Sequence, residues 1–236
     1  MPRPSAPVIV QDNATGGVSY WDGRTNQSEA DENGVSLADY IHAMFGFILA
    51  VKARDVLMIG CGGGTLATML RRAGIGVTIV DISARSFTIA RRYFHLPAEV
   101  ETHVAEGAAF LRRHTHRYDA IVLDAYDDEE IPEHFLTRAF FDLAKLRMAP
   151  RGALFLLNII VADDDDRTPD DIARLMGKTW RNVRLLDSDG WLDRNCVAAA
   201  GAVTGLKRPT LLMPPARGAK KFAEGLKTMK FRKLRR

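Results

Sequence analysis

Short apolar runs alternate with amphipathic stretches through most of this chain, and the alternation predicts its architecture. The runs are continuous, which is typical of strands buried on both faces of a parallel sheet. Five strand-like runs precede an acidic loop at 163–166, and they occupy 55–59, 77–81, 100–104, 119–124 and 153–160, of which 100–104 is the weaker one. Helical patterns separate them at 65–73, 83–94, 108–114 and 133–146. This order predicts an α/β protein with a mostly parallel sheet covered by helices.

The pattern changes after the acidic loop. A helix near 169–180 is followed by two strand-like runs, 183–187 and 195–200, on either side of Asp189-Gly190. So short a connection favours an antiparallel hairpin. The expected core is therefore a Rossmann-like, doubly wound sheet of seven strands that is mostly parallel and ends in this hairpin.

The beginning of the chain predicts a small β appendage. Strand-like runs at 8–11 and 18–21 lie on either side of Gly16-Gly17, and Ser36 is placed to cap a helix over 37–51. We expect three parts, which are the appendage at 1–36, the Rossmann-like domain at 37–203 and a basic tail at 204–236.

Composition is that of an ordinary folded protein. Hydrophobic residues make up 47% of the 236 residues and charged residues 26%, enough to bury a sizeable core. We find neither an apolar run near the ~20 residues that cross a bilayer nor the apolar core of a signal peptide in the first ten residues. The pattern predicts a cytoplasmic protein without membrane contact. The chain has two cysteines, Cys61 and Cys196, in apolar strand-like positions, so we expect neither a metal cluster nor a disulfide.

The net charge of +4 is unevenly distributed. Residues 217–236 hold nine Lys/Arg and one Glu, which leaves 24 basic and 28 acidic residues in 1–216. The body is therefore mildly acidic. The tail interleaves its cations with apolar residues, so it is interpreted as an amphipathic helix that packs on the body or on a partner. Nucleic-acid binding through 217–236 is a possible role but not the favoured one.

A glycine-rich loop at 60–64 follows the first long strand and opens a helix. Its backbone can approach a ligand closely, and the helix start offers free N–H groups. Asp81 ends the next strand, where a carboxylate can accept hydrogen bonds from both hydroxyls of an adenosine ribose. The pair predicts a nucleoside site.

Further acids follow the later strands. Glu106-Gly107 is placed to contact an adenine ring, although Glu106 could instead cap the following helix. Asp124 and Asp127 lie at the carboxyl edge of the sheet, where clustered carboxylates can bind an amine or take its proton. The neighbouring acids at 128–130 are interpreted as a solvated loop.

Together these features resemble the spermidine synthase family of aminopropyltransferases, within the class I S-adenosylmethionine-dependent methyltransferase fold. The resemblance extends from about 18 to 160. In that family a strand precedes Asp-Gly, then a Gln and an Asp-Glu pair, before the helix that leads to the glycine loop. Here Asp22-Gly23, Gln27 and Asp31-Glu32 stand in that order.

The resemblance implies roles for individual residues. S-adenosylmethionine or its decarboxylated form would be bound, without a metal, by Gln27, Gly60, Gly62, Gly64, Asp81, Ile82, Glu106, Gly107 and Asp124. The segment 124–127 is similar to the family's catalytic Asp-Ser-Ser-Asp, so Asp127 would orient or deprotonate the amine and Asp124 would lie beside the sulfonium. The amine acceptor would contact Tyr40, His42, Tyr126 and Asp127. A homodimer with a role in polyamine biosynthesis is also implied.

Three functions stay open from the sequence. The first is aminopropyl transfer to a small amine. The second is methyl transfer on the same scaffold, because the glycine loop lacks the acid with which the family binds the aminopropyl nitrogen and instead contains Gly62-Gly63-Gly64-Thr65. The third is a nucleic-acid-associated protein that acts through its tail.

Overall fold

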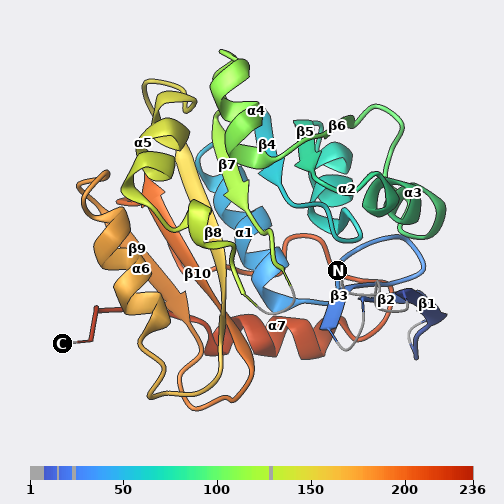
Figure 1. Ribbon diagram of the computed structural model, residues 1–236. Helices are drawn as coiled ribbons and strands as arrows, with labels where there is room; N and C mark the ends of the chain where they lie inside the picture. Colours follow the sequence, from blue (N-terminus) through green and yellow to red (C-terminus); the bar gives the residue numbers. More distant parts are fainter. Residues whose placement is uncertain (1–7, 15, 23–24, 128–129, 236) are drawn as a thin grey trace, which may run out of the picture.

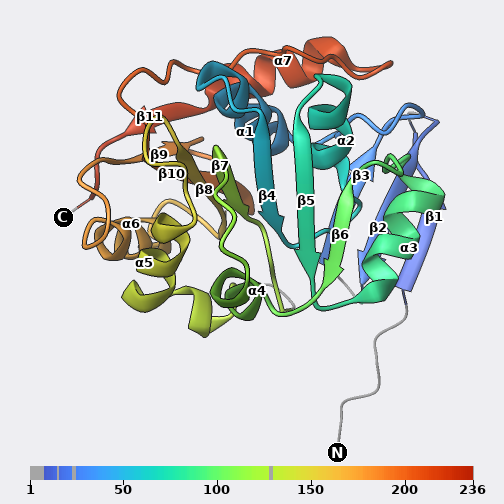
Figure 2. The ribbon, with the colours of Figure 1, turned by 90° about the horizontal axis from the view of Figure 1, so that it is seen from above.

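The computed structural model describes residues 8–14, 16–22, 25–127 and 130–235, and an eight-stranded mixed sheet forms its centre (Figures 1 and 2). Five parallel strands correspond to the apolar runs: β4 (Asp55–Ile59), β5 (Gly76–Asp81), β6 (Glu101–Val104), β7 (Ala120–Leu123) and β8 (Leu154–Val161). The antiparallel hairpin of β9 (Val183–Asp187) and β10 (Arg194–Gly201) continues the sheet beside β8. The predicted fold class is confirmed.

The sheet contains one strand more than the seven predicted. The additional strand, β11 (Lys230–Arg232), comes from the basic tail and pairs antiparallel with β9, so the order is β11-β9-β10-β8-β7-β4-β5-β6. The tail also forms α7 (Ala219–Thr228), whose Phe222 and Leu226 are buried on the body. The amphipathic helix is therefore confirmed, and its apolar face packs on this chain.

Helices cover both faces of the sheet. Figure 2 shows α1 (Asp39–Ala50), α2 (Thr65–Arg72) and α7 on one face. The other face carries α4 (Gly107–Arg113), α5 (Arg138–Leu146) and α6 (Thr168–Met176). Along β4, Val56 and Met58 join the core under α1, whereas Leu57 and Ile59 join the core under α5. Successive side chains of a strand point to opposite faces, so a continuous apolar run supplies both cores.

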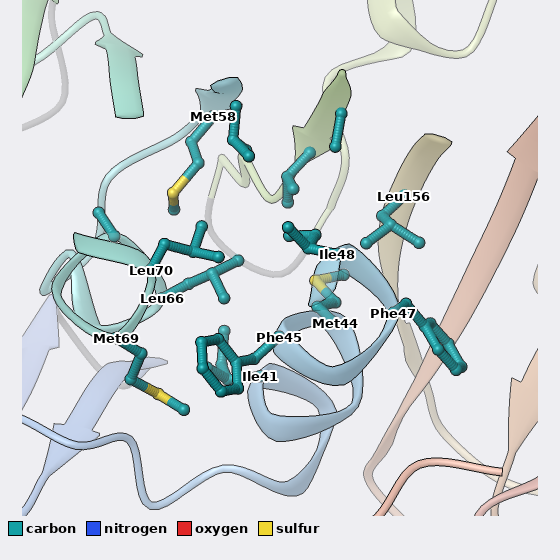
Figure 3. Packing of buried hydrophobic residues seen from close by; sticks show 14 of the residues in the cluster. Ile41, Met44, Phe45, Phe47, Ile48, Met58, Leu66, Met69, Leu70 and Leu156 are labelled. Atoms are coloured by element: carbon teal, nitrogen blue, oxygen red, sulfur yellow. The ribbon is translucent and has the colours of Figure 1, made fainter. Parts of the chain in front are cut away.

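The helix α1 forms the centre of the first core. Four of its side chains recur at helical spacing and pack against α2 and β4, as Figure 3 shows for Ile41, Met44, Phe45 and Ile48. All four are buried, and each contributes about 1.5–3 kcal/mol through the burial of its apolar surface. This packing fixes the start of α1, and with it Tyr40, at one edge of the sheet.

A separate antiparallel sheet forms the N-terminal appendage. It contains β1 (Val8–Asp12), β2 (Val18–Asp22) and a third strand, β3 (Thr25–Ala30), that the sequence pattern did not indicate. The helix α3 (Ala84–Tyr93) packs Ile89 on this sheet.

Among the predicted helix boundaries that differ from the structure, those of α1 and α5 have a clear cause in capping. Ala38 occupies the N-cap position of α1, and the Ser36 hydroxyl accepts a hydrogen bond from the Ala38 N–H (3.2 Å) without capping the helix. The helix expected at 133–146 is divided into a short 3₁₀ turn, Glu133–Phe135, and α5, which Thr137 caps through the Phe140 N–H. Among the described residues, no helix has the length and apolar character to cross a membrane.

Candidate functional site

A cavity of about 210 Å³ opens at the carboxyl edge of β4, β7 and β8. Its walls come from six segments of the chain that are separated in sequence. The lining residues are Asn26, Gln27, Ser28, Tyr40, Ile41, Met58, Gly60, Cys61, Gly62, Thr65, Leu66, Asp124, Tyr126, Asn158, Ile160, Asp193, Arg194 and Asn195. The strand edge thus brings together the glycine loop, the first strand-end acid of the 124–127 segment and the start of α1, as the sequence predicts.

The glycine loop is held tightly between neighbouring segments. Gly60 has φ +97°, and a Cβ at this position would lie 2.1 Å from the carbonyl oxygen of Asp124. Gly62 also has positive φ (+49°), and a Cβ there would meet Ser28 Oγ at 2.9 Å. The Ser28 hydroxyl accepts a hydrogen bond from the Gly63 N–H (2.8 Å), which fixes the loop against β3. Glycine is therefore required at 60 and 62 by backbone geometry and by space.

Asp81 connects the glycine loop to α3. One carboxylate oxygen accepts from the Cys61 N–H (2.8 Å) and the other from the Ser83 N–H (2.7 Å). Burial raises the pKa of Asp81, although these two hydrogen bonds oppose the rise. The next side chain, Ile82, is 77% exposed and offers an apolar surface beside the carboxylate. A carboxylate next to an uncovered aliphatic side chain is suited to a ribose and an adjoining flat base.

Glu106 is a helix cap in this structure, as the capping alternative predicts. Its two oxygens accept from the Ala108 and Ala109 N–H groups at the start of α4 (both 2.7 Å). His134 Nε2 lies 3.1 Å from the same carboxylate. Gly107 is in close packing, since a Cβ there would lie 2.5 Å from a methyl carbon of Ile59. These contacts leave an adenine-binding role for Glu106 and Gly107 as a proposal.

Asp124 lies in the cavity with both carboxylate oxygens engaged. Tyr40 Oη donates to one oxygen (3.2 Å) and Asn158 Nδ2 donates to the other (2.8 Å). Burial raises the pKa of Asp124, and the bonds from Asn158 and Tyr40 oppose that rise. Asn195 Nδ2 donates in turn to Asn158 Oδ1 (3.0 Å), so three polar side chains and Asp124 form one chain of hydrogen bonds.

The other residues of the 124–127 segment are placed differently. Tyr126 lines the cavity, but its hydroxyl donates to the Asn158 carbonyl (2.7 Å) and accepts from the Ile160 N–H (3.1 Å). Asp127 is exposed, forms a backbone bridge with Glu130 and does not belong to the cavity wall. The acids at 128 and 129 lie outside the described residues. The structure therefore brings Asp124, and not Asp127, into the cavity.

Residues of the N-terminal motif have separate positions. Gln27 lines the cavity, whereas Asp31 is buried and accepts from the Val35 and Ala216 N–H groups (2.8 and 2.6 Å). Gly23 lies outside the described residues. His42 was expected to contact the acceptor, but it lies away from the cavity, with its Nε2 2.8 Å from the Ser36 carbonyl oxygen and its ring beside Phe222.

Sequence reasoning missed several polar residues of the wall. Asn158 interrupts the apolar run of β8, and that interruption is the signal that could have identified it. Asn195 and Arg194 carry no such signal, because only the pairing of β10 with β8, opposite Ile160 and Val161, brings them to the cavity wall. Within the described part of the chain, no group of three or more His, Cys, Asp or Glu is arranged to hold a metal ion.

Comparisons with known proteins show which sequences and folds this chain is similar to. A family described as a methyltransferase domain matches residues 56–145. A probable polyamine aminopropyl transferase of Bifidobacterium longum is 26% identical over 160 residues, which cover 67% of this chain and 36% of the relative. A polyamine aminopropyltransferase of Chromobacterium violaceum is 32% identical over 126 residues, covering 50% of this chain and 48% of the relative. The chain thus spans between about a third and a half of these two relatives.

A solved structure supports the fold. A probable spermidine synthase from Corynebacterium glutamicum superposes with a TM-score of 0.71 at 19% identity, covering 84% of this chain and 80% of that one. The sequence resemblance and the predicted fold are both confirmed by these findings.

Proposed function

We propose that this chain, a divergent member of the spermidine synthase-like family on the class I methyltransferase fold, is a transferase that uses a sulfonium nucleoside. One observation carries the proposal, which is that Asp81 and Asp124 flank the same glycine loop. Asp81 accepts from the Cys61 N–H, and the Asp124 carbonyl leaves no room for a Cβ at Gly60. A nucleoside held at Asp81 would therefore extend along the loop toward Asp124.

The residues present suit S-adenosylmethionine or its decarboxylated form. Asp81 would hold the ribose, Ile82 would contact the adenine, and Gly60, Gly62 and Gln27 would line the rest of the ligand. Gly64 opens α2 with φ +67° and would shape the loop. When bound, the sulfonium supplies an electrophilic carbon for an amine to attack.

Asp124 is the group best placed to act on that amine. Both of its oxygens already accept hydrogen bonds, so the carboxylate is held in a fixed orientation at the cavity wall. Such a group aligns the amine and stabilises the positive charge that develops on nitrogen. Asp127 is exposed and lies outside the cavity wall, and it would receive the proton that the amine releases. Tyr40 and Tyr126 would complete the acceptor wall.

Aminopropyl transfer to a small-molecule amine is the first candidate, because the relatives named above are aminopropyltransferases. A homodimer in the cytoplasm, with a role in polyamine biosynthesis, belongs to the same proposal. Nucleic-acid binding by the tail is not favoured, because Arg232 and Arg235 contact acids of this chain.

Methyl transfer is the second candidate, and a specific contact favours it. A Cβ at Gly63 would lie 2.7 Å from the ring of Phe94, so the loop has no space for an acid at this position. The neighbouring lining side chains are the neutral Asn26, Gln27, Ser28 and Thr65. A site without an acid there has less reason to prefer the decarboxylated cofactor, whose amine is cationic.

The experiment that separates the candidates is mass spectrometry of small amines incubated with the protein and each cofactor. Aminopropyl transfer predicts a product heavier by one aminopropyl group with the decarboxylated cofactor. A product heavier by one methyl group, formed only with S-adenosylmethionine, would establish the second candidate and refute the first. If neither product forms with any amine, the proposed transfer to small amines is wrong.

A further inference from the structure

Buried ion pairs connect the C-terminal strand to the hairpin beside the cavity. Arg232 of β11 donates through both terminal nitrogens to Asp170 (3.0 Å each) and through Nε to Asp187 (2.8 Å). The side chains of Asp170 and Asp187 have no exposed surface, and that of Arg232 is 10% exposed. A single arginine therefore pairs with two buried carboxylates that lie on α6 and β9.

The same network continues into the cavity wall. The second oxygen of Asp187 accepts from Arg194 Nε (2.8 Å), and Arg194 also pairs with Asp164 (3.0 Å) and bonds to the Trp191 carbonyl. Arg194 is thereby fixed to the hairpin turn, to the acidic loop after β8 and, through Asp187, to the C-terminal strand. It is also one of three consecutive lining residues, 193–195.

The next residue extends the connection to Asp124. Asn195 donates to Asn158, which donates to Asp124. The position of residues 193–195 therefore determines whether this hydrogen-bond chain can form. Burial alone would raise the pKa of Asp187, but hydrogen bonds and charges from Arg194 and Arg232 lower it. Asp187 is therefore an anion, and both arginines compensate the cost of burying its charge.

We propose that Arg232 is a positioning residue for the acceptor side of the cavity, acting through Asp187 and Arg194 on residues 193–195. The kinetic part of this inference rests on the proposed transferase function, whereas its structural part does not. Loss of the Arg232 charge leaves Asp170 and Asp187 buried without their shared partner. Arg194 must then compensate Asp187 alone, and the hairpin turn that it holds becomes free to move.

The structural part is tested by amide hydrogen exchange of the full chain without ligand. Arg232→Met keeps an apolar stem and removes the charge, and Lys230→Met is the matched control because Lys230 is an exposed cation on the same strand. We expect faster exchange at 188–195 in Arg232→Met, unchanged exchange at the glycine loop, and the wild-type pattern in Lys230→Met. Faster exchange confined to β11 and the start of α6 would overturn the proposal.

The kinetic part is tested with the acceptor identified by mass spectrometry. Perturbation of such a network changes coupling by about 0.5–2 kcal/mol, so we expect kcat/KM for the acceptor to fall about 2- to 30-fold in Arg232→Met. The dissociation constant of the cofactor should stay within about twofold, because the Asp81 side of the site does not belong to the network. If cofactor affinity and acceptor kcat/KM fall by the same factor, Arg232 is not a positioning residue for the acceptor side.

Arg232→Lys keeps the inference testable if Arg232→Met does not fold. Lysine retains the charge but cannot bond to both acids with fixed geometry, so it should give an intermediate rate of exchange at 188–195. Wild-type exchange in Arg232→Lys, together with reduced acceptor kcat/KM, would refute the route through the hairpin. If the wild-type protein transfers no group, the exchange result still decides whether Arg232 positions residues 193–195.

Discussion

The Tyr40 hydroxyl donates a hydrogen bond to Asp124 (3.2 Å), although 84 positions separate the two residues in sequence. The bond joins the start of α1 to the end of β7, and both residues line the cavity. With Asn158 on the other oxygen, Asp124 is held as an oriented carboxylate. The acceptor side of the site is thus defined by contacts that no local sequence motif contains.

Replacing Tyr40 by Phe removes one of these bonds and keeps the ring. The pKa of Asp124, already raised by burial, should rise further because a bond that favours the ionised form is lost. Transfer that needs the ionised carboxylate should then show an acidic limb of kcat/KM that lies at higher pH than in the wild-type protein. At pH values on this limb, kcat/KM of Tyr40→Phe should be lower than that of the wild-type protein. Tyr93→Phe, on the exposed end of α3, is the control. A pH profile that does not move would show that Tyr40 does not act through Asp124.

Asp81 and Asp127 have separate roles in the proposal, in cofactor binding and in proton transfer from the amine. Asp81→Ala should weaken cofactor binding by about 10- to 100-fold, since hydrogen bonds to a charged group contribute ~1.5–3 kcal/mol. Asp127→Ala should leave binding unchanged and lower turnover. Calorimetry of both variants, combined with single-turnover rates, measures the difference. Equal loss of binding in the two variants would refute this division of roles.

Gly60 is required by space as well as by its backbone conformation. Gly74 offers the control, because it has φ +78° but no heavy atom lies within 4 Å of the point that a Cβ would occupy. Alanine at Gly74 should cost about 1–2 kcal/mol of unfolding free energy from the left-handed conformation alone. Alanine at Gly60 should cost ~1–3 kcal/mol more, because its Cβ would lie 2.1 Å from the Asp124 carbonyl. Urea denaturation compares the two, and equal losses would contradict the steric argument.

Asp39 should make stability depend on pH. Burial beneath α7 raises its pKa from 3.8 to about 6, although the charge of Lys221 opposes the rise. Between these two pH values the folded state keeps a proton that the unfolded state has lost. The contribution of Asp39 to stability is therefore complete below pH 3.8 and is lost as the pH rises to about 6. The total change is at most about 3 kcal/mol, and solvent screening of this partly exposed carboxyl makes it smaller.

Asp39→Asn should remove this dependence and stabilise the protein at pH 7. Unfolding by urea at pH 4.5 and pH 7 measures the effect, and Asp171→Asn on the exposed surface of α6 is the control. If wild type and Asp39→Asn show the same difference between the two pH values, Asp39 is not the group responsible.

Four of the parallel strands, β4, β5, β7 and β8, could be predicted because each is a continuous apolar run that supplies both cores. β6 is a weaker signal, because its four residues are partly or fully exposed. β11 could not be predicted, since it has only three residues and two of them are cations. Its arginine becomes a buried residue only after Asp170 and Asp187, which are 62 and 45 positions away, are folded beside it. Long-range charge compensation of this kind leaves no periodic signal in the sequence.

The site was predictable where residues lie at strand ends. The glycine loop, Asp81 and Asp124 share one edge because parallel strands end there together. Tyr40 and His42 were expected to act together, but residues two apart on a helix point in different directions. Tyr40 therefore faces the cavity, while His42 is 1% exposed and contacts the tail helix. The position of Asn195 depends on the register of the hairpin, which no local sequence pattern specifies.

The central claim is that the cavity beside Asp81 and Asp124 binds a sulfonium nucleoside. Calorimetric titration of the wild-type chain with S-adenosylmethionine and with its decarboxylated form, beside the same titrations of Asp81→Ala, tests it most directly. The account predicts saturable binding of at least one form to a single site per chain, and weaker binding to Asp81→Ala. Absence of binding for both forms, or equal affinity in Asp81→Ala, would contradict it.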